Sequence, residues 1–194
     1  NRRLWCADAK ASYDASFTIA PQLGTLDMGA VLAHIRTVLP PDAIVTNGAG
    51  NFATWPSKFI KYNKDMRLLA PQSGAMGYGL PAALAAKAFD PDRFVLCFAG
   101  DGDFQMNCVE LGTAMQAGLN PIVLIVNNAS YGTIRMHQER NYPQRISGTD
   151  LQNPDVVGLA RSYGFYGERI ESTDQFAAAY ERAQQSKTGA ILDL

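Results

Sequence analysis

The fold is decided by residues 94–128, whose sequence is FVLCFAGDGDFQMNCVELGTAMQAGLNPIVLIVNN. Two apolar runs, 94–99 and 121–126, flank a segment that ends at Gly118. Continuous apolar runs of this length are typical of parallel strands that are buried on both faces. The stretch therefore predicts a strand, a helix over 107–117 and a second strand.

The alternation of strands and helices continues on both sides of this stretch. Apolar runs predict strands over 43–46, 68–69, 94–99, 121–126, 166–170 and 190–194. Helical periodicity predicts helices over 26–39, 52–62, 81–89, 107–117, 154–163 and 174–186. Such alternation with short connections predicts an α/β fold with a doubly wound, mainly parallel sheet and helices on both faces.

The composition excludes several classes of protein. The chain has 194 residues, of which 47% are hydrophobic, and 17 Lys+Arg stand against 18 Asp+Glu. This balance is neither that of a disordered chain nor that of a polybasic nucleic-acid-binding protein. No run of about 18 apolar residues is available to span a membrane. We therefore expect neither a nucleic acid nor a membrane as partner.

The cysteines and the first residues of the chain indicate its cellular location and its domain organisation. The three cysteines, Cys6, Cys97 and Cys108, are an odd number without metal-ligand spacing, which favours a reducing, cytoplasmic location. Residues 1–23 lack clear periodicity and are predicted to be a linker or arm from a preceding domain, whereas 24–194 form the α/β domain. Because the chain opens on Asn rather than Met, we expect it to be a piece of a longer protein.

Polar residues follow three of the predicted strands, at 47–51, 100–102 and 127–128. Ligands of open parallel sheets bind beyond the carboxyl ends of the strands. One helix and one strand separate Asp101 from Asn128, so both side chains reach the same edge if the two strands are neighbours. A carboxylate and an amide oxygen suit Mg²⁺, which takes its other ligands from water and phosphate. Gly102 lets the chain start a helix whose amides can face a phosphate.

Two other interpretations of these residues remain open. Gly-Asp-Gly can be a simple turn and Asn-Asn a loop opener. Residues 77–82 match the pattern G-x-G-x-x-A of dinucleotide-binding proteins, although the first glycine does not directly follow a solid strand. A nicotinamide site would also leave Asn128 without a role.

At these residues the sequence resembles the diphosphate-binding domain of thiamine-diphosphate-dependent enzymes. The signature is Gly100-Asp101-Gly102, followed after a helix and a strand by Asn127-Asn128. Within that superfamily the sequence is most similar to the acetolactate synthase-like branch, along 45–55, 73–86, 94–128 and 131–132. The resemblance implies decarboxylation of a 2-oxo acid with carboligation, dependent on thiamine diphosphate and Mg²⁺. A 2-oxo acid decarboxylase, an oxidase, an acyl-CoA lyase and a non-catalytic cofactor-binding module remain alternatives.

The resemblance also implies a set of site residues. The metal ligands would be Asp101, Asn128 and the backbone carbonyl of Ser130. The cofactor would be held by Gly50, Asn51, Gly74, Met76, Gly100, Gly102, Asp103, Tyr131 and Gly132. Backbone amides of Gly102 and Asp103 would lie against the diphosphate, and the flexible thioether of Met76 would keep the cofactor bent.

The remaining implications concern what this chain does not supply. The glutamate that activates the cofactor belongs to another domain, contributed by a partner subunit, so no catalytic residue is assigned here. The expected assembly is a homo-oligomer, either a dimer or a tetramer, and the requirement for FAD stays open because a flavin site would draw on other domains.

The sequence departs from the acetolactate synthase pattern at two places. Asn51-Phe52 stands where those enzymes usually carry Gln-His, and His137 stands where they carry a Trp. Arg135, His137 and Arg140 could meet a carboxylate or phosphate of an acidic substrate, or they could form a solvated loop or helix face.

We expect the isolated 194-residue chain to be inactive, because the activating glutamate would come from a different domain. The measurement is CO₂ release from a 2-oxo acid in the presence of thiamine diphosphate and Mg²⁺. Measurable decarboxylation by this chain alone would contradict the expectation.

Overall fold

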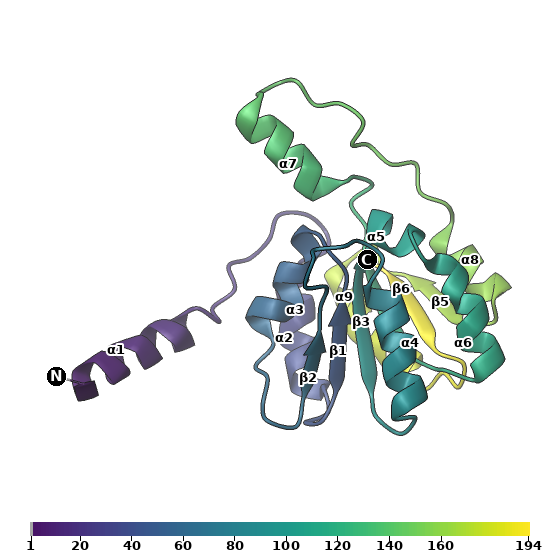
Figure 1. Cartoon of the computed structure of the whole chain (residues 1–194), viewed down its shortest axis with the longest axis horizontal. Coiled ribbons are helices and arrows are strands. Elements are labelled where there is room, and N and C mark those ends of the chain that lie inside the picture. Colours follow the sequence, from purple (N-terminus) through teal and green to yellow (C-terminus); the bar gives the residue numbers. More distant parts are fainter. Residues whose placement is uncertain (1) are drawn as a thin grey trace.

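The computed structural model describes residues 2–194, so Asn1, the first residue of the predicted arm, lies outside the described residues. These residues form one parallel sheet with the strand order β2-β1-β3-β4-β6-β5 (Figure 1). The strands are β1 (Ile44–Asn47), β2 (Arg67–Leu69), β3 (Val95–Gly100), β4 (Ile122–Val126), β5 (Tyr166–Arg169) and β6 (Ala190–Asp193). The α-helices are α1 (Arg2–Ala15), α2 (Met28–Val38), α3 (Thr54–Phe59), α4 (Gly79–Phe89), α5 (Asp101–Gln105), α6 (Leu111–Ala117), α7 (Gly132–Asn141), α8 (Val156–Ser162) and α9 (Thr173–Gln184), and the 3-10 helices are η1 (Asn51–Ala53) and η2 (Cys108–Glu110).

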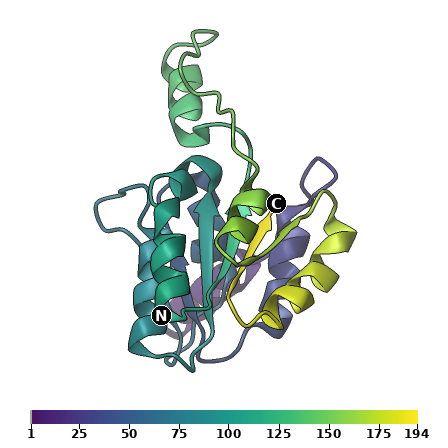
Figure 2. The same cartoon turned by 90° about the vertical axis from the view of Figure 1, so that its right-hand side faces the viewer.

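Helices cover both faces of the sheet, as Figures 1 and 2 show from two sides. Helices α2, α3 and α9 pack on one face, and α4, α6 and α8 pack on the other. Alternate residues of β3 point to opposite cores, Leu96 and Phe98 to the first and Cys97 and Ala99 to the second. The predicted α/β fold with a parallel, doubly wound sheet is therefore confirmed.

The order of the strands creates a crevice between β1 and β3. From β1 the chain runs through α3 to β2 on one side, and then returns through α4 to β3 on the other side of β1. Such a reversal separates the loops that leave the two carboxyl ends, which is where open α/β sheets bind ligands. Because Gly100 of β3 pairs with Val126 of β4, the residues after these two strands reach the same edge.

Helix α2 begins at Met28, two residues after the start of the predicted helix over 26–39. Asp27 is its N-cap, and its Oδ1 accepts a hydrogen bond of 2.7 Å from the amide of Gly29. An N-cap carboxylate of this kind satisfies an amide that has no partner within the helix. Leu39, the C-cap, precedes the prolines that prevent the helix from continuing.

The predicted helix over 107–117 is interrupted, and a helix begins earlier than expected. Helix α5 starts at Asp101, directly after β3, and the chain turns at Asn107 before η2 and α6. At this turn Nδ2 of Asn107 donates a hydrogen bond of 2.8 Å to the carbonyl of Gly77, in the loop before α4. Helix α6 then ends as predicted at Gly118, whose φ of 66° is left-handed.

Two helices lie where no helix was predicted. Helix α1 lies within the expected arm, and α7 follows Tyr131. Neither helix contains a buried residue, and the large apolar side chains of α1, those of Leu4, Trp5 and Tyr13, are exposed. More than half of the residues of α1, and half of those of α7, have good helix propensity. Figure 2 shows α7 standing clear of the sheet, beyond the carboxyl ends of the strands.

The helices of residues 2–194 are either too short or too polar for any of them to cross a bilayer.

We expect Leu124→Ala to lower the free energy of unfolding by about 2–5 kcal/mol, because Leu124 is fully buried in the central strand β4. Leu4→Ala is the matched control, since Leu4 on α1 is 64% exposed, and it should change stability by less than about 0.5 kcal/mol. Denaturant unfolding of both variants provides the measurement. Equal effects of the two substitutions would contradict the assignment of the core.

Candidate functional site

A cleft of about 360 Å³ opens beyond the carboxyl ends of β1, β3 and β4. Its walls include every one of the twelve residues to which the sequence assigned the cofactor or the metal. They are Gly50, Asn51, Gly74, Met76, Gly100, Asp101, Gly102, Asp103, Asn128, Ser130, Tyr131 and Gly132. The remaining lining residues are Ala49, Phe52, Trp55, Val126, Thr133 and Ile134. The residues predicted from separate segments of the sequence thus meet in one place.

Asp101 and Asn128 enter this cleft from neighbouring strands. Asp101 follows β3 and is 3% exposed, and its Oδ2 accepts a hydrogen bond of 2.6 Å from Nδ2 of Asn153. Asn128 follows β4, and its Oδ1 accepts a hydrogen bond of 3.1 Å from the amide of Ser130. Asn128 is exposed, so its side chain remains accessible from the cleft.

The donor atoms at this edge of the cleft fit a hard cation. A carboxylate, an amide oxygen and the carbonyl of Ser130 are oxygen ligands of the kind that Mg²⁺ prefers, with water and phosphate completing its coordination. No group of three or more His, Cys, Asp and Glu side chains that could hold a metal occurs in residues 2–194. The described part of the chain therefore has no site of the multi-carboxylate or Cys/His type.

Glycines bring the backbone itself to the surface of the cleft. A Cβ atom on Gly102 would lie 2.6 Å from the Tyr131 ring, and one on Gly100 would lie 2.8 Å from the Phe52 ring. A Cβ atom on Gly132 would lie 2.9 Å from Nδ2 of Asn128. These positions have no room for a side chain, so the wall consists of peptide groups, which can approach an anionic ligand closely.

The side chain of Asp103 has a role that the sequence did not reveal, since only its backbone amide was assigned. Asp103 is buried, and its Oδ1 accepts hydrogen bonds from the amides of Gly77, at 2.7 Å, and Ala49, at 3.2 Å. Burial raises the pKa of this carboxyl to about 6, although the amide hydrogen bonds act in the opposite direction. The carboxylate thereby joins the loops after β1 and before α4 to the start of α5.

The glycine pattern at 77–82 serves packing between a helix and a strand. A Cβ atom on Gly79 would lie 2.8 Å from the backbone nitrogen of Gly48, so only glycine lets α4 approach β1 this closely. Oγ1 of Thr46 donates a hydrogen bond of 2.8 Å to the carbonyl of Gly79. None of residues 77–82 lines the cleft. This arrangement disfavours the dinucleotide interpretation of the pattern.

Of the residues that depart from the acetolactate synthase pattern, Asn51 and Phe52 line the cleft, whereas His137 does not. Oδ1 of Asn51 accepts a hydrogen bond of 3.0 Å from Oγ1 of Thr133, which connects η1 with the first turn of α7. The ring of Phe52 lies against both Gly50 and Gly100.

Gly74 and Met76 line the same cleft from the loop before α4. Gly74 has a φ of 67°, a left-handed conformation that favours glycine, and Met76 is half-buried.

The basic residues of α7 lie outside the cleft. Arg135 forms an ion pair of 3.7 Å with Asp150, and Arg140 contacts Nδ1 of His137 at 2.6 Å. All four side chains are exposed. Arg135, His137 and Arg140 thus lie on the solvated face of a helix, one of the two positions that the sequence analysis left open.

Asn153 was missed by the sequence analysis although it contacts Asp101. It lies in the loop before α8, a long way along the chain from the signature residues, and no periodicity or spacing marks it. The adjacent Pro154 indicates a loop but not the direction of the side chain.

Comparison with known proteins identifies a family and several relatives. The family model described as "Thiamine pyrophosphate enzyme, C-terminal TPP binding domain" matches residues 48–194. The chain is 38% identical over 179 residues to the acetolactate synthase large subunit of Parasynechococcus marenigrum, which covers 91% of this chain and 29% of that protein. It is 35% identical over 153 residues to the acetolactate synthase isozyme 2 large subunit of Escherichia coli, covering 78% of this chain and 28% of that protein.

The chain spans less than a third of the length of these relatives. The family expected from the signature residues is confirmed.

We expect Gly48→Ala to lower the free energy of unfolding by more than about 2 kcal/mol, since its Cβ would lie 1.9 Å from Oδ1 of Asp103. Displacing that carboxylate leaves the buried amide of Gly77 without its acceptor, at a cost of about 1–3 kcal/mol, and adds steric strain. Gly112→Ala is the matched control, because the nearest atom to its Cβ is 3.4 Å away and alanine favours a helix by about 0.5–1 kcal/mol. Thermal unfolding distinguishes the two, and a stable Gly48→Ala protein would refute the role of Asp103.

Proposed function

This chain belongs to the thiamine pyrophosphate enzymes and carries their C-terminal cofactor-binding domain, and on that premise we propose that it forms the diphosphate- and Mg²⁺-binding half of a carboligase site. The proposed reaction is acetolactate synthase-like, the decarboxylation of a 2-oxo acid followed by carboligation. The observation that carries the proposal is the meeting of all twelve assigned residues in one cleft at the β1–β3 crevice. The names of the relatives support the same reaction class.

Asp101, Asn128 and the carbonyl of Ser130 are the proposed Mg²⁺ ligands. The support is chemical and positional, because these hard oxygen donors come from adjacent strand ends and line one wall. A divalent cation here would offset part of the negative charge of the two phosphates, and phosphate oxygens would complete its ligand set, so a single carboxylate from the protein suffices. When bound, thiamine diphosphate supplies the electron sink for decarboxylation.

The proposed diphosphate contacts are made by backbone groups of the glycine-rich walls. Gly50, Gly100, Gly102 and Asp103 come from the ends of β1 and β3, and Asn51 lies beside them. Tyr131 and Gly132 come from the start of α7, a helix of 10 residues. Their own amides donate hydrogen bonds of 2.8 Å to the carbonyls of Thr149 and Ser130, so an amide for the phosphate would come from later in the first turn. Helix N-termini of this kind favour phosphate.

Gly74 and Met76 are the proposed contacts of the aminopyrimidine. Both line the cleft from the loop before α4. Backbone groups of this loop would bind the ring, and the unbranched thioether of Met76 would fill the space between the two rings of the cofactor.

The remaining parts of the proposal concern the whole protein. We propose that residues 24–194 are the cofactor-binding domain, that 1–23 are an arm from a preceding domain, and that another domain supplies the activating glutamate. The relatives are described as large subunits, which supports assembly of this chain into an oligomer, with a homodimer as its minimal unit. The free cysteines Cys6, Cys97 and Cys108 favour a cytoplasmic location.

A non-catalytic cofactor-binding module is the main alternative. An enzyme and a non-catalytic module differ in one feature. The enzyme needs an acidic residue at the activating position of the partner domain, and the module does not. Substrate trials with the full-length protein separate a carboligase from a simple decarboxylase, an oxidase or an acyl-CoA lyase.

We expect Asp101→Ala and Asn128→Ala to weaken Mg²⁺-dependent binding of thiamine diphosphate by more than about 100-fold, because loss of even an outer partner of a metal ligand costs about 10- to 100-fold. Calorimetric titration of the full-length protein is the measurement. The chain offers matched controls at the opposite ends of the same strands, Asp92→Ala before β3 and Asn120→Ala before β4, both of which should bind normally.

A titration with NAD in place of thiamine diphosphate tests the dinucleotide interpretation. Binding of NAD without binding of thiamine diphosphate would overturn the assignment of the cofactor. Undiminished affinity for thiamine diphosphate in Asp101→Ala would overturn the assignment of Asp101 as a metal ligand.

A further inference from the structure

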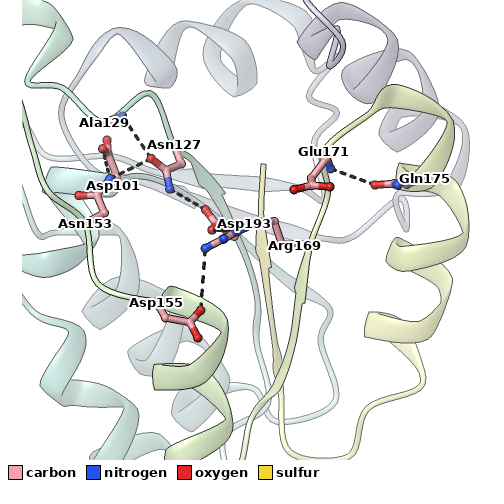
Figure 3. A network of polar contacts seen from close by, with 9 residues as sticks. All are labelled: Asp101, Asn127, Ala129, Asn153, Asp155, Arg169, Glu171, Gln175 and Asp193. Carbon is pink, nitrogen blue, oxygen red and sulfur yellow. Dashed lines mark hydrogen bonds and ion pairs between the residues drawn. The ribbon is translucent and has the colours of Figure 1, made fainter.

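A chain of polar side chains runs from β6, the strand next to the edge strand β5, to Asp101, and the proposed function uses only its last member (Figure 3). It begins at Asp193, the final residue of β6, which is 2% exposed. Oδ1 of Asp193 accepts a hydrogen bond of 2.9 Å from Nδ2 of Asn127, and Oδ2 accepts one of 3.0 Å from Nε of Arg169. The buried carboxylate is thus paired with a guanidinium and fixes the side chain of Asn127.

Asn127 connects this anchor to the loop that carries two proposed metal ligands. Its Oδ1 accepts a hydrogen bond of 3.2 Å from the amide of Ala129. Ala129 has a φ of 51°, a left-handed conformation that is unfavourable for alanine and needs support from its surroundings. The side chain of Asn127 therefore helps to hold the conformation in which Asn128 and Ser130 reach the cleft.

Asn153 connects the same anchor to Asp101. Its Nδ2 donates two hydrogen bonds, one of 2.6 Å to Oδ2 of Asp101 and one of 2.9 Å to Oδ1 of Asn127. Its Oδ1 accepts a hydrogen bond of 2.9 Å from Nε2 of Gln105. Reversing the amide would bring its oxygen against the acceptors of Asp101 and Asn127, so the surroundings permit one orientation only.

We propose that Asn153 is a positioning residue for the metal, which sets the spacing between Asp101 and the loop of Asn128 and Ser130. This inference rests on the proposed function, since it needs those residues to be the ligands. One amide group bridges the two halves of the ligand set, so its loss would release Asp101 from the Asn127 loop. Because the amide is neutral, it orients the carboxylate without cancelling the negative charge that attracts the cation.

The hydrogen bond from Asn153 to Oδ2 also gives the two carboxylate oxygens of Asp101 different roles. Within residues 2–194, Oδ2 is the oxygen of Asp101 that accepts a side-chain hydrogen bond, which leaves the lone pairs of Oδ1 for a cation. Asn153 thereby selects a one-oxygen mode of binding, which suits the octahedral geometry of Mg²⁺.

The experiment is a Mn²⁺ titration of the full-length protein saturated with thiamine diphosphate, followed by electron paramagnetic resonance. We expect Asn153→Ala to weaken Mn²⁺ binding by about 10- to 100-fold and to alter the spectrum of the bound ion. Gln152→Ala is the matched control, because Gln152 is the exposed neighbour, and it should leave both unchanged. A merely structural role of Asn153 would lower the unfolding temperature and leave the affinity and the spectrum of the folded protein unchanged.

Asn153→Ser covers the case in which the alanine variant does not fold, since its hydroxyl keeps one donor in a small side chain. It should weaken Mn²⁺ binding in the same direction but to a smaller extent. Unaltered affinity and spectrum in every variant that folds would overturn the positioning role while the proposed function stands. If the unsubstituted protein shows no metal-dependent binding of thiamine diphosphate, the proposed function fails, and this proposal fails with it.

Discussion

A buried carboxylate, that of Asp103, holds together the segments that form the floor of the cleft. It accepts amide hydrogen bonds from the loop after β1 and from the loop before α4, while its own backbone begins the helix after β3. The hydrogen bonds do not fully offset the cost of burial, as the raised pKa of this carboxyl indicates. The geometry of the crevice therefore depends on the hydrogen bonds of one buried carboxylate, whose desolvation costs free energy. Gly48 belongs to the same constraint, because any larger residue would occupy the space of the carboxylate.

Two chemically different kinds of group line the cleft beside Asp103. Glycines present peptide groups with no intervening side chains, which suits close contact with phosphate oxygens. Among them, Asp101 and Asn128 present oxygen atoms suited to a cation. The paired Asp193 and Arg169 hold the side chain of Asn127, and through it Asn153 and Asp101, from β6 and β5.

The sequence predicts those elements whose hydrophobic pattern matches the burial that the fold gives them. The residues of β3 and β4 alternate between two cores, so their continuous apolar runs correctly predicted strands buried on both faces. The resemblance carried by Gly100–Gly102 and Asn127–Asn128 led to twelve of the residues that line the cleft. Helices α1 and α7 were missed because neither buries an apolar face. The side-chain contacts of Asp103 and Asn153 could not be predicted either, because they join segments whose distance in space is set only by the completed sheet.

The attachment of α1 has a consequence for how the chain unfolds. Phe17 is buried, with the ammonium group of Lys61 over its ring, whereas the 14 residues of α1 before it bury nothing. A helix of this length that buries none of its residues is marginal in water and opens independently of the core. The amides of α1 therefore exchange their hydrogens with solvent through local fraying, whereas those of the central strands exchange only when the whole domain unfolds. Phe17 marks the boundary at which the cooperative unit begins.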